Sequence, residues 1–487
     1  MTATNGAGLT STGTTFTSTD DSTAPTGGSL TYSAGYTTGN AVALTFTAGS
    51  DAGSGLNSAA HQLQRRSAPL ELGVCNTGLW SAWTTLAGSP VNDTTVTGDT
   101  CYQYQYVTYD NVGNSTVYPA NSNPIVKVPM YHTCQAAAVG GSAIGYYRLS
   151  ETSGTTAADS SGNGKNGAYA NVTSYNAGGP CGGGGVTYNG LTMGYVSTPL
   201  QVTNPAVFTE EIWFKTASAD SMRIMGFGDL QTGSSGSYDR LIYLDTNSRL
   251  VYGYNAGLLT YKTLTSTAAY NDNKWHHVVA TQSTTNGMRL YVDGALLKSD
   301  NTATTPQNYT GYWRIGSDNM TGWPTLTILI NSYMNGSLSN GAFYSRELTG
   351  QEVFNHYLAA QLTSPSVLTP PSSISASAQS AVTSARRLAA SASASAPSSP
   401  SASASASASA SASASASASA SASASASASA SASASVQAPS SSVFTGTPSF
   451  SMPQAPLSPP LAPTIPSPAT IPPALLPPTP ENVPPSE

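Results

Sequence analysis

The chain has 487 residues, enough for two or three domains, and only 8% of them are charged, against roughly 25% in average globular proteins. The formal net charge of −6, with 17 Lys and Arg in total, excludes the basic surface that nucleic-acid binding requires. No apolar run approaches the ~20 residues of a membrane-spanning helix, and the 45 Gly and 32 Pro indicate a β-rich, loop-rich chain of the secreted type.

Residues 1–20 are rich in Thr, Ser and Gly, and we expect them to form a linker. The stretch "TATNGAGLTSTG" has neither the positive n-region nor the apolar h-region of a signal peptide. Because the rest of the composition is of the extracellular type, we expect the sequence to be a fragment, or to lack its natural start.

Residues 21–129 alternate short strands with turns. In "AVALTFTAGSDAGSGL" the side chains of Val42, Leu44 and Phe46 share one face of a strand, and the tyrosines of "CYQYQYVTYDNVGNST" alternate in the same way. This spacing predicts a small antiparallel sandwich. The segment resembles the immunoglobulin-like or fibronectin-III-like modules repeated in bacterial surface proteins, which implies a spacer more often than a binding unit.

The chain has four cysteines and no C-x-x-C pair, so a zinc or thioredoxin-type site is not expected. Their distribution predicts two local disulfides, Cys75–Cys101 and Cys134–Cys181, each within one domain. The alternative is four free, buried thiols. Disulfides would place the protein in an oxidising compartment, outside the cell or on its surface.

After a linker at 130–140, residues 141–362 form a second β-rich region. The stretch "WHHVVATQSTTNGMRLYVDG" predicts a strand, a type I′ hairpin turn at Asn286–Gly287, and a returning strand. The adjacent His276 and His277 then point to opposite faces of their strand, so they cannot bind one metal ion together.

This second region resembles the laminin-G-like, concanavalin A-like jelly roll. The resemblance rests on this stretch and on four others in the same order, "YYRLSETSGTTAADSSGNGKNG", "FTEEIWFKT", "YWRIGSDN" and "YMNGSLSNGAFYSRELTGQEVFNHYLA". It implies two packed antiparallel sheets. A short closing helix is expected over 349–358, with Thr349 as N-cap and Glu352 at the third helical position. The fold class is therefore all-β, an immunoglobulin-like sandwich followed by a jelly roll.

Catalysis is not expected. Retaining glycosidases of the same superfamily carry two glutamates that must flank one bond at a separation of ~5 Å. The close pair in this chain, Glu210 and Glu211, is adjacent and therefore on opposite faces of a strand. We expect no catalytic residue.

Calcium is the one cofactor that the sequence suggests. The loop "DSSGNG", from Asp159 to Gly164, is rich in oxygen ligands of the kind that Ca²⁺ prefers, and Asp159 and Asn163 are the candidate ligands. An ordinary turn stabilised by its Asp and Asn side chains is the alternative.

Glycan binding would need an exposed aromatic ring beside a few polar groups. Trp323 follows "SDN" in a loop-like stretch and is the candidate platform, with Tyr312 as a second ligand-binding residue. Trp213, Trp275 and Trp313 alternate with apolar strand residues, and we expect them in the core.

Residues 363–487 include a long Ser-Ala repeat and a Pro-rich end. Such a composition cannot bury enough apolar surface to fold, so we predict a disordered tail that acts as a linker or stalk.

These features predict a non-catalytic extracellular surface protein whose jelly roll binds a glycan or a surface protein in an adhesive role, associated with a cell wall or matrix. One alternative is a purely structural spacer without a ligand. The other is an accessory region of a secreted glycoside-active enzyme.

Overall fold

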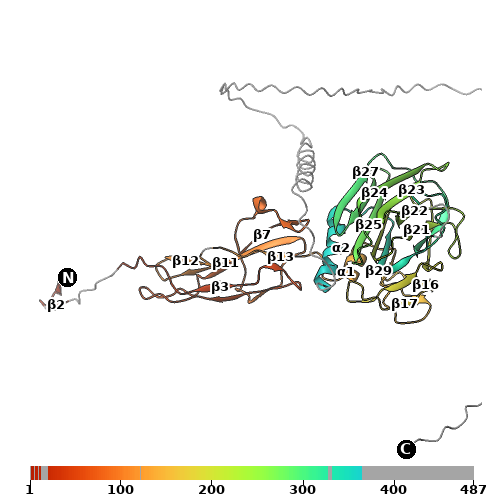
Figure 1. Ribbon diagram of the computed structural model, residues 1–487. Helices are drawn as coiled ribbons and strands as arrows, with labels where there is room; N and C mark the ends of the chain where they lie inside the picture. Colours follow the sequence, from red (N-terminus) through yellow and green to blue (C-terminus); the bar gives the residue numbers. More distant parts are fainter. Residues whose placement is uncertain are drawn as a thin grey trace, which may run out of the picture. The chain divides into compact units, whose positions relative to one another are not determined.

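The computed structural model describes residues 2–4, 6–8, 10–12, 20–120, 122–326 and 332–364 (Figure 1). The predicted disordered tail, 363–487, lies outside the described residues except for its first two positions. Within the predicted linker at 1–20, two short strands, β1 (Thr2–Thr4) and β2 (Thr10–Thr12), pair with each other.

The first module is built on one sheet with the strand order β4-β13-β11-β7-β8, to which β9 and β12 add at the sides. Two small strand pairs, β3 with β6 and β5 with β10, accompany the sheet. The strands are β3 (Ser29–Thr31), β4 (Gly35–Tyr36), β5 (Val42–Ala43), β6 (Thr45–Thr47), β7 (Gln62–Glu71), β8 (Val74–Cys75), β9 (Thr84–Thr85), β10 (Asn92–Asp93), β11 (Thr100–Tyr109), β12 (Ser115–Tyr118) and β13 (Val126–Val128), with a 3₁₀ turn η1 (Thr77–Leu79).

The core of this module contains the predicted alternating side chains. Val42 and Leu44 are buried and Phe46 packs against them, while Tyr102 and Tyr104 of β11 lie in the same cluster. The alternation expected from the sequence is therefore confirmed. The likeness to immunoglobulin-like modules stays a prediction.

The second region is a sandwich of two eight-stranded sheets. One sheet has the order β17-β18-β29-β20-β25-β26-β27, with β14 beside β29, and the other has the order β15-β16-β19-β28-β21-β22-β23-β24. The strands are β14 (Gly145–Tyr147), β15 (Thr156–Ala157), β16 (Gly167–Ala170), β17 (Ser174–Tyr175), β18 (Val186–Asn189), β19 (Tyr195–Thr203), β20 (Phe208–Lys215), β21 (Met222–Gly228), β22 (Tyr238–Leu244), β23 (Arg249–Asn255), β24 (Tyr261–Ala269), β25 (His276–Ser283), β26 (Gly287–Val292), β27 (Ala295–Asp300), β28 (Thr310–Gly316) and β29 (Asn335–Tyr344). Apolar side chains from both sheets fill the space between them.

Two helices cover the outer face of the sheet that contains β20 and β29 (Figure 1). The first, α1 (Cys134–Gly140), lies inside the segment that was predicted as a linker, and the Thr133 side chain caps it by accepting a hydrogen bond from Ala136 N. The second, α2 (Gly350–Thr363), begins with the predicted capping box of Thr349 and Glu352 and runs five residues beyond the predicted end at 358. No helix in the described part of the chain combines the length and apolar character needed to cross a membrane.

The β25-β26-β27 meander forms as expected, but its first turn is wider than predicted. Ser283 pairs with Gly287, so three residues, 284–286, form the loop, and Gly287 alone of the predicted pair has a positive φ, 67°. The hydroxyl of Ser283 accepts hydrogen bonds from the backbone N–H groups of Thr285 and Asn286, both at 3.2 Å, which stabilises the wider loop.

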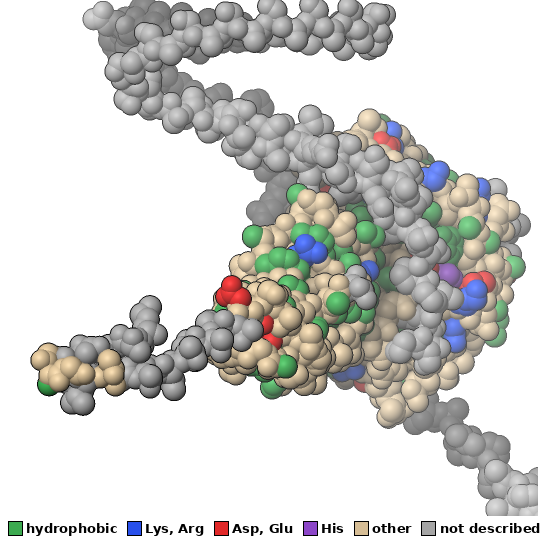
Figure 2. Space-filling view, turned by 90° about the vertical axis from the view of Figure 1, so that its left-hand side faces the viewer, with side chains coloured by type: hydrophobic (Ala, Val, Ile, Leu, Met, Phe, Trp, Pro, Cys, Tyr) green, Lys and Arg blue, Asp and Glu red, His purple; other side chains and the backbone are tan. Residues whose placement is uncertain are grey.

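The two predicted disulfides, Cys75–Cys101 and Cys134–Cys181, are both formed, which rules out the alternative of free thiols. Uncharged polar side chains and backbone dominate the face of the molecule in Figure 2, and charged side chains are scattered over it.

Candidate ligand-binding site

Trp323 is not the exposed platform that we predicted, because its side chain is only 3% exposed. The segment after β28 folds over the outer face of β22 and β23 and buries the indole in a cluster with Leu241 and Met320. The ring of Tyr261 packs against the indole at 4.9 Å between centroids. A Cβ on Gly253 would lie 2.9 Å from Cζ3 of Trp323, so this strand needs a glycine for the indole to approach.

Trp323 nevertheless forms part of the wall of a pocket with a volume of about 380 Å³. The pocket lies where β22 begins, β23 ends and β24 begins, so adjacent strands supply its walls. The lining residues are Gly236, Ser237, Tyr238, Asn255, Leu259, Tyr261, Gln307, Thr321, Gly322 and Trp323. Three aromatic rings and two carboxamides thus meet in one concave site without any charged side chain.

Hydrogen bonds to neighbouring backbone groups fix the positions of several polar groups of the pocket. The Asn255 side-chain oxygen accepts a hydrogen bond from Gly257 N at 2.8 Å, and the Asn255 backbone oxygen accepts one from Gln307 N at 2.7 Å. The Tyr238 hydroxyl donates to Thr321 O at 2.7 Å. Among the described residues, the Tyr261 hydroxyl and the Gln307 carboxamide have no hydrogen-bond partner, so both are available to a ligand.

Burial raises the pKa of both pocket tyrosines, and for Tyr238 the neighbouring Tyr261 adds to the effect. Both phenols are therefore neutral at physiological pH: the Tyr261 hydroxyl can donate to a ligand, and the Tyr238 hydroxyl, whose proton is bonded to Thr321 O, can accept from one. Together with the carboxamides they provide a site for hydroxyl-rich, uncharged ligands.

A buried ion cluster connects the two loops that border the pocket. The carboxylate of Asp318 accepts hydrogen bonds from Ser235 N at 2.8 Å and from the Ser235 hydroxyl at 2.7 Å. It also pairs with Arg223 at 2.9 Å and Arg314 at 3.1 Å. Burial alone would raise the pKa of Asp318, but the two guanidiniums and Ser235 hold it below its ordinary value.

Tyr312, the second residue predicted to bind a ligand, is half-buried on β28 and does not line this pocket. The residues that do line it, Tyr238, Asn255, Tyr261 and Gln307, were not selected from the sequence. They lie far apart along the chain, and only the order of strands in the sheet brings them together.

The predicted calcium ligands organise a loop. Asp159 Oδ1 accepts hydrogen bonds from Tyr146 N at 3.0 Å and Ser161 N at 2.9 Å, and its Oδ2 accepts one from Lys165 N at 2.9 Å. The Asn163 carboxamide donates to Ala143 O at 2.9 Å. Calcium binding by this loop stays a prediction.

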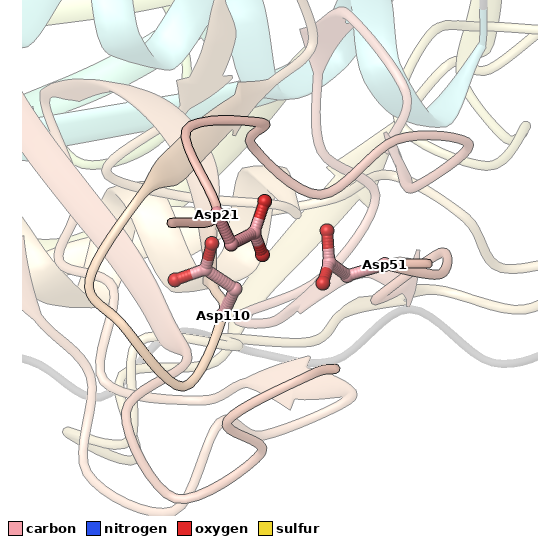
Figure 3. Close-up of side chains that lie close together, drawn as sticks. All are labelled: Asp21, Asp51 and Asp110. Atoms are coloured by element: carbon pink, nitrogen blue, oxygen red, sulfur yellow. The ribbon is translucent and has the colours of Figure 1, made fainter. Parts of the chain in front are cut away.

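Three other carboxylates gather in the first module, those of Asp21, Asp51 and Asp110, with oxygens within 4.8 Å of one another (Figure 3). An oxygen-only donor set of this kind suits a hard cation. Each carboxylate also accepts hydrogen bonds from loop N–H groups, for example Asp51 from Gly55 N at 2.7 Å. These three residues are not recognisable as a group in the sequence, because they come from three separate loops.

The adjacent glutamates lie on opposite faces of β20, as predicted. Glu210 points into the space between the sheets and is fully buried, and Glu211 points toward the helices. The two carboxyl groups therefore cannot flank one glycosidic bond.

The fold defined by these strands is that of a concanavalin A-like jelly roll. Residues 191–354 match the model of the Concanavalin A-like lectin/glucanases superfamily, of the laminin-G type, which confirms the predicted resemblance for this region. A domain of this class with a concave, aromatic pocket suggests binding of a carbohydrate or another ligand.

Among solved structures, the chain is similar to Trypanosoma rangeli sialidase in complex with sialic acid, with 15% identity and a TM-score of 0.34, over 56% of this chain and 44% of that chain. It is also similar to the botulinum neurotoxin serotype D binding domain, with 15% identity and a TM-score of 0.32, over 44% of this chain and 51% of that one. The chain thus spans less than half of the sialidase. Similarities at this level carry no information on activity. A search of curated proteins found no significant match.

Proposed function

We propose that the chain is a non-catalytic binding protein whose jelly roll takes a neutral glycan into the pocket of Tyr238, Tyr261 and Trp323. The observation that carries this proposal is the combination of aromatic rings and free hydrogen-bonding groups in one uncharged pocket. The C–H faces of a sugar ring pack on aromatic rings, and its hydroxyls hydrogen-bond to carboxamides such as that of Gln307.

The absence of charge in the lining supports binding without hydrolysis. Glycoside hydrolysis canonically needs a carboxylic acid and a carboxylate on either side of the scissile bond. None of the ten residues that line the pocket is an Asp or Glu.

We propose an extracellular or cell-surface location, because the two disulfides fit an oxidising compartment. An adhesive role, with a glycan or glycosylated surface protein as the partner and attachment to a cell wall or matrix, follows from the glycan-binding proposal.

A glycan array followed by calorimetry with the Tyr261→Ala variant tests the site. We expect the wild-type chain to bind neutral glycans and the variant to lose about tenfold or more in affinity, because Tyr261 provides both a ring face and a free hydroxyl.

Tyr312→Ala is the matched control, since it removes a half-buried tyrosine from the same sandwich but outside the pocket. Loss of binding in Tyr312→Ala with normal binding in Tyr261→Ala would place the site elsewhere. No glycan bound by the wild-type chain would favour the structural spacer.

A further inference from the structure

The turn between β23 and β24 contains two strongly exposed leucines. Leu258 is 102% exposed and Leu259 is 75% exposed, whereas the other leucines of these two strands, Leu250 and Leu264, are buried. Two adjacent leucines at the tip of a hairpin do not gain the free energy that their burial would provide. Exposed apolar side chains of this kind often mark a site of contact with another apolar surface.

The backbone of this turn holds both leucines in an unfavourable conformation. Leu258 and Leu259 have φ angles of 49° and 58°, in the left-handed region that asparagine and glycine tolerate much better. Hydrogen bonds from Ala256 N to Thr260 O at 2.7 Å and from Thr260 N to Gly257 O at 2.9 Å close the turn. The turn is therefore well formed, and it presents two leucines where a polar residue would be more stable.

One of the two exposed leucines, Leu259, lines the aromatic pocket, and Leu258 precedes it in the turn. The pocket thus has an apolar side, formed by Leu259 with Leu258 next to it in the turn, and a polar side that contains Asn255 and Gln307. With no charged side chain in the lining, a charged ligand would find no counter-ion there.

We propose that the natural ligand is a neutral glycan that carries an alkyl chain, as in a glycolipid, with the sugar in the pocket and the alkyl chain on Leu258 and Leu259. This inference rests on the proposed function and names the ligand class of the same site. The leucines would lose their contact with water only when the alkyl chain is bound, which explains why they are exposed in the free protein.

The experiment compares matched methyl and octyl β-glycosides of glucose, galactose and N-acetylglucosamine by calorimetry, below the concentration at which the octyl compounds form micelles. We expect the octyl glycoside of the recognised sugar to bind about tenfold more tightly than the methyl glycoside, the effect of removing roughly two methylene groups from water.

The Leu258→Asn variant should remove most of this difference and leave methyl glycoside binding within twofold of wild type, because Leu258 does not line the pocket. Asparagine tolerates the left-handed conformation, so the turn should keep its shape. Leu191→Asn is the control, because Leu191 is 81% exposed and lies outside the pocket, and it should keep the full preference for the octyl compound.

The possible outcomes separate the two proposals. Equal binding of methyl and octyl glycosides to the wild-type chain, or an octyl preference that is unchanged in Leu258→Asn, would overturn the ligand class and leave the glycan site intact. If no methyl or octyl glycoside binds, both proposals fail. If the methyl and octyl glycosides both bind to the wild-type chain and neither binds to Tyr261→Ala, the pocket is the sugar-binding site whatever the role of the leucines.

Discussion

The carboxylate of Glu211 lies at the centre of a buried network on the helix-covered face of the sandwich. Its Oε1 accepts a hydrogen bond from His277 Nε2 at 2.9 Å, and its Oε2 accepts bonds from His356 Nδ1 at 2.9 Å and from the Tyr344 hydroxyl at 2.7 Å. Burial would raise the pKa of Glu211, but the two histidines and their hydrogen bonds hold it well below its ordinary value. The network links β20, β25, β29 and α2.

Replacing Glu211 with glutamine should lower the free energy of unfolding by about 3 kcal/mol, because one carboxamide cannot accept from all three donors and leaves a buried donor unpaired. Urea unfolding at pH 7 measures the change. The control Asp220→Asn alters an exposed carboxylate and should stay within about 0.5 kcal/mol of wild type. An equal, small effect of both variants would contradict a structural role for the Glu211 charge.

The same network predicts a pH dependence with a definite sign. A carboxyl group whose pKa is lower in the folded state stabilises the fold above its unfolded pKa, about 4.3 for Glu, and loses that contribution as the pH falls through the folded value. The difference in stability between wild type and Glu211→Gln should therefore be constant from pH 7 to about pH 5 and shrink below that. A difference that grows on acidification would show that the carboxylate is not held ionised.

At the scale of strands and loops, the features that could be predicted are those set by residues close together in the sequence, such as the alternation of side chains along a strand. Alternation placed His276 and His277 on opposite faces, and His277 indeed stacks on Trp213 under the helices while His276 contacts Asp293 at 2.9 Å. Trp323 was misplaced because its burial depends on the segment after β28 folding across β22 and β23, a contact between distant parts of the sequence. The pocket was not predicted for the same reason, since its lining residues come from distant parts of the sequence.

The loops that border the pocket depend on Asp318, so Asp318→Asn tests how the site is supported. The substitution leaves the buried guanidiniums of Arg223 and Arg314 without their carboxylate, and we expect a loss of about 3–5 kcal/mol in unfolding free energy. Denaturant unfolding measures it. Lys274→Gln is the control, since it breaks an ion pair whose lysine side chain is 61% exposed, and it should cost less than about 1 kcal/mol. A change as small as that of the control would mean that the cluster does not hold the loops.

At the scale of the whole molecule, each disulfide lies within one module, and the jelly-roll disulfide lies away from the aromatic pocket. Cys75–Cys101 joins β8 to β11 in the first module, and Cys134–Cys181 ties α1 to the loop between β17 and β18 in the jelly roll. The pocket is formed by the opposite sheet, with walls from β22, β23 and β24. Loss of the jelly-roll disulfide should therefore lower stability without changing ligand binding.

The Cys134→Ser/Cys181→Ser variant tests this separation. The bridge closes a loop with a sequence separation of 47, and removing such a cross-link should lower the stability of the jelly roll by about 4 kcal/mol in the chain-entropy model. Differential scanning calorimetry should show a lower melting temperature for the variant, while its affinity for the recognised glycan, measured well below that temperature, stays within twofold of wild type. Helix α1 packs on the outer face of one sheet, and the pocket belongs to the other sheet. A large loss of affinity in a variant that is still folded would therefore mean that the two faces of the sandwich are coupled. An unchanged melting temperature would contradict a stabilising role for the bridge.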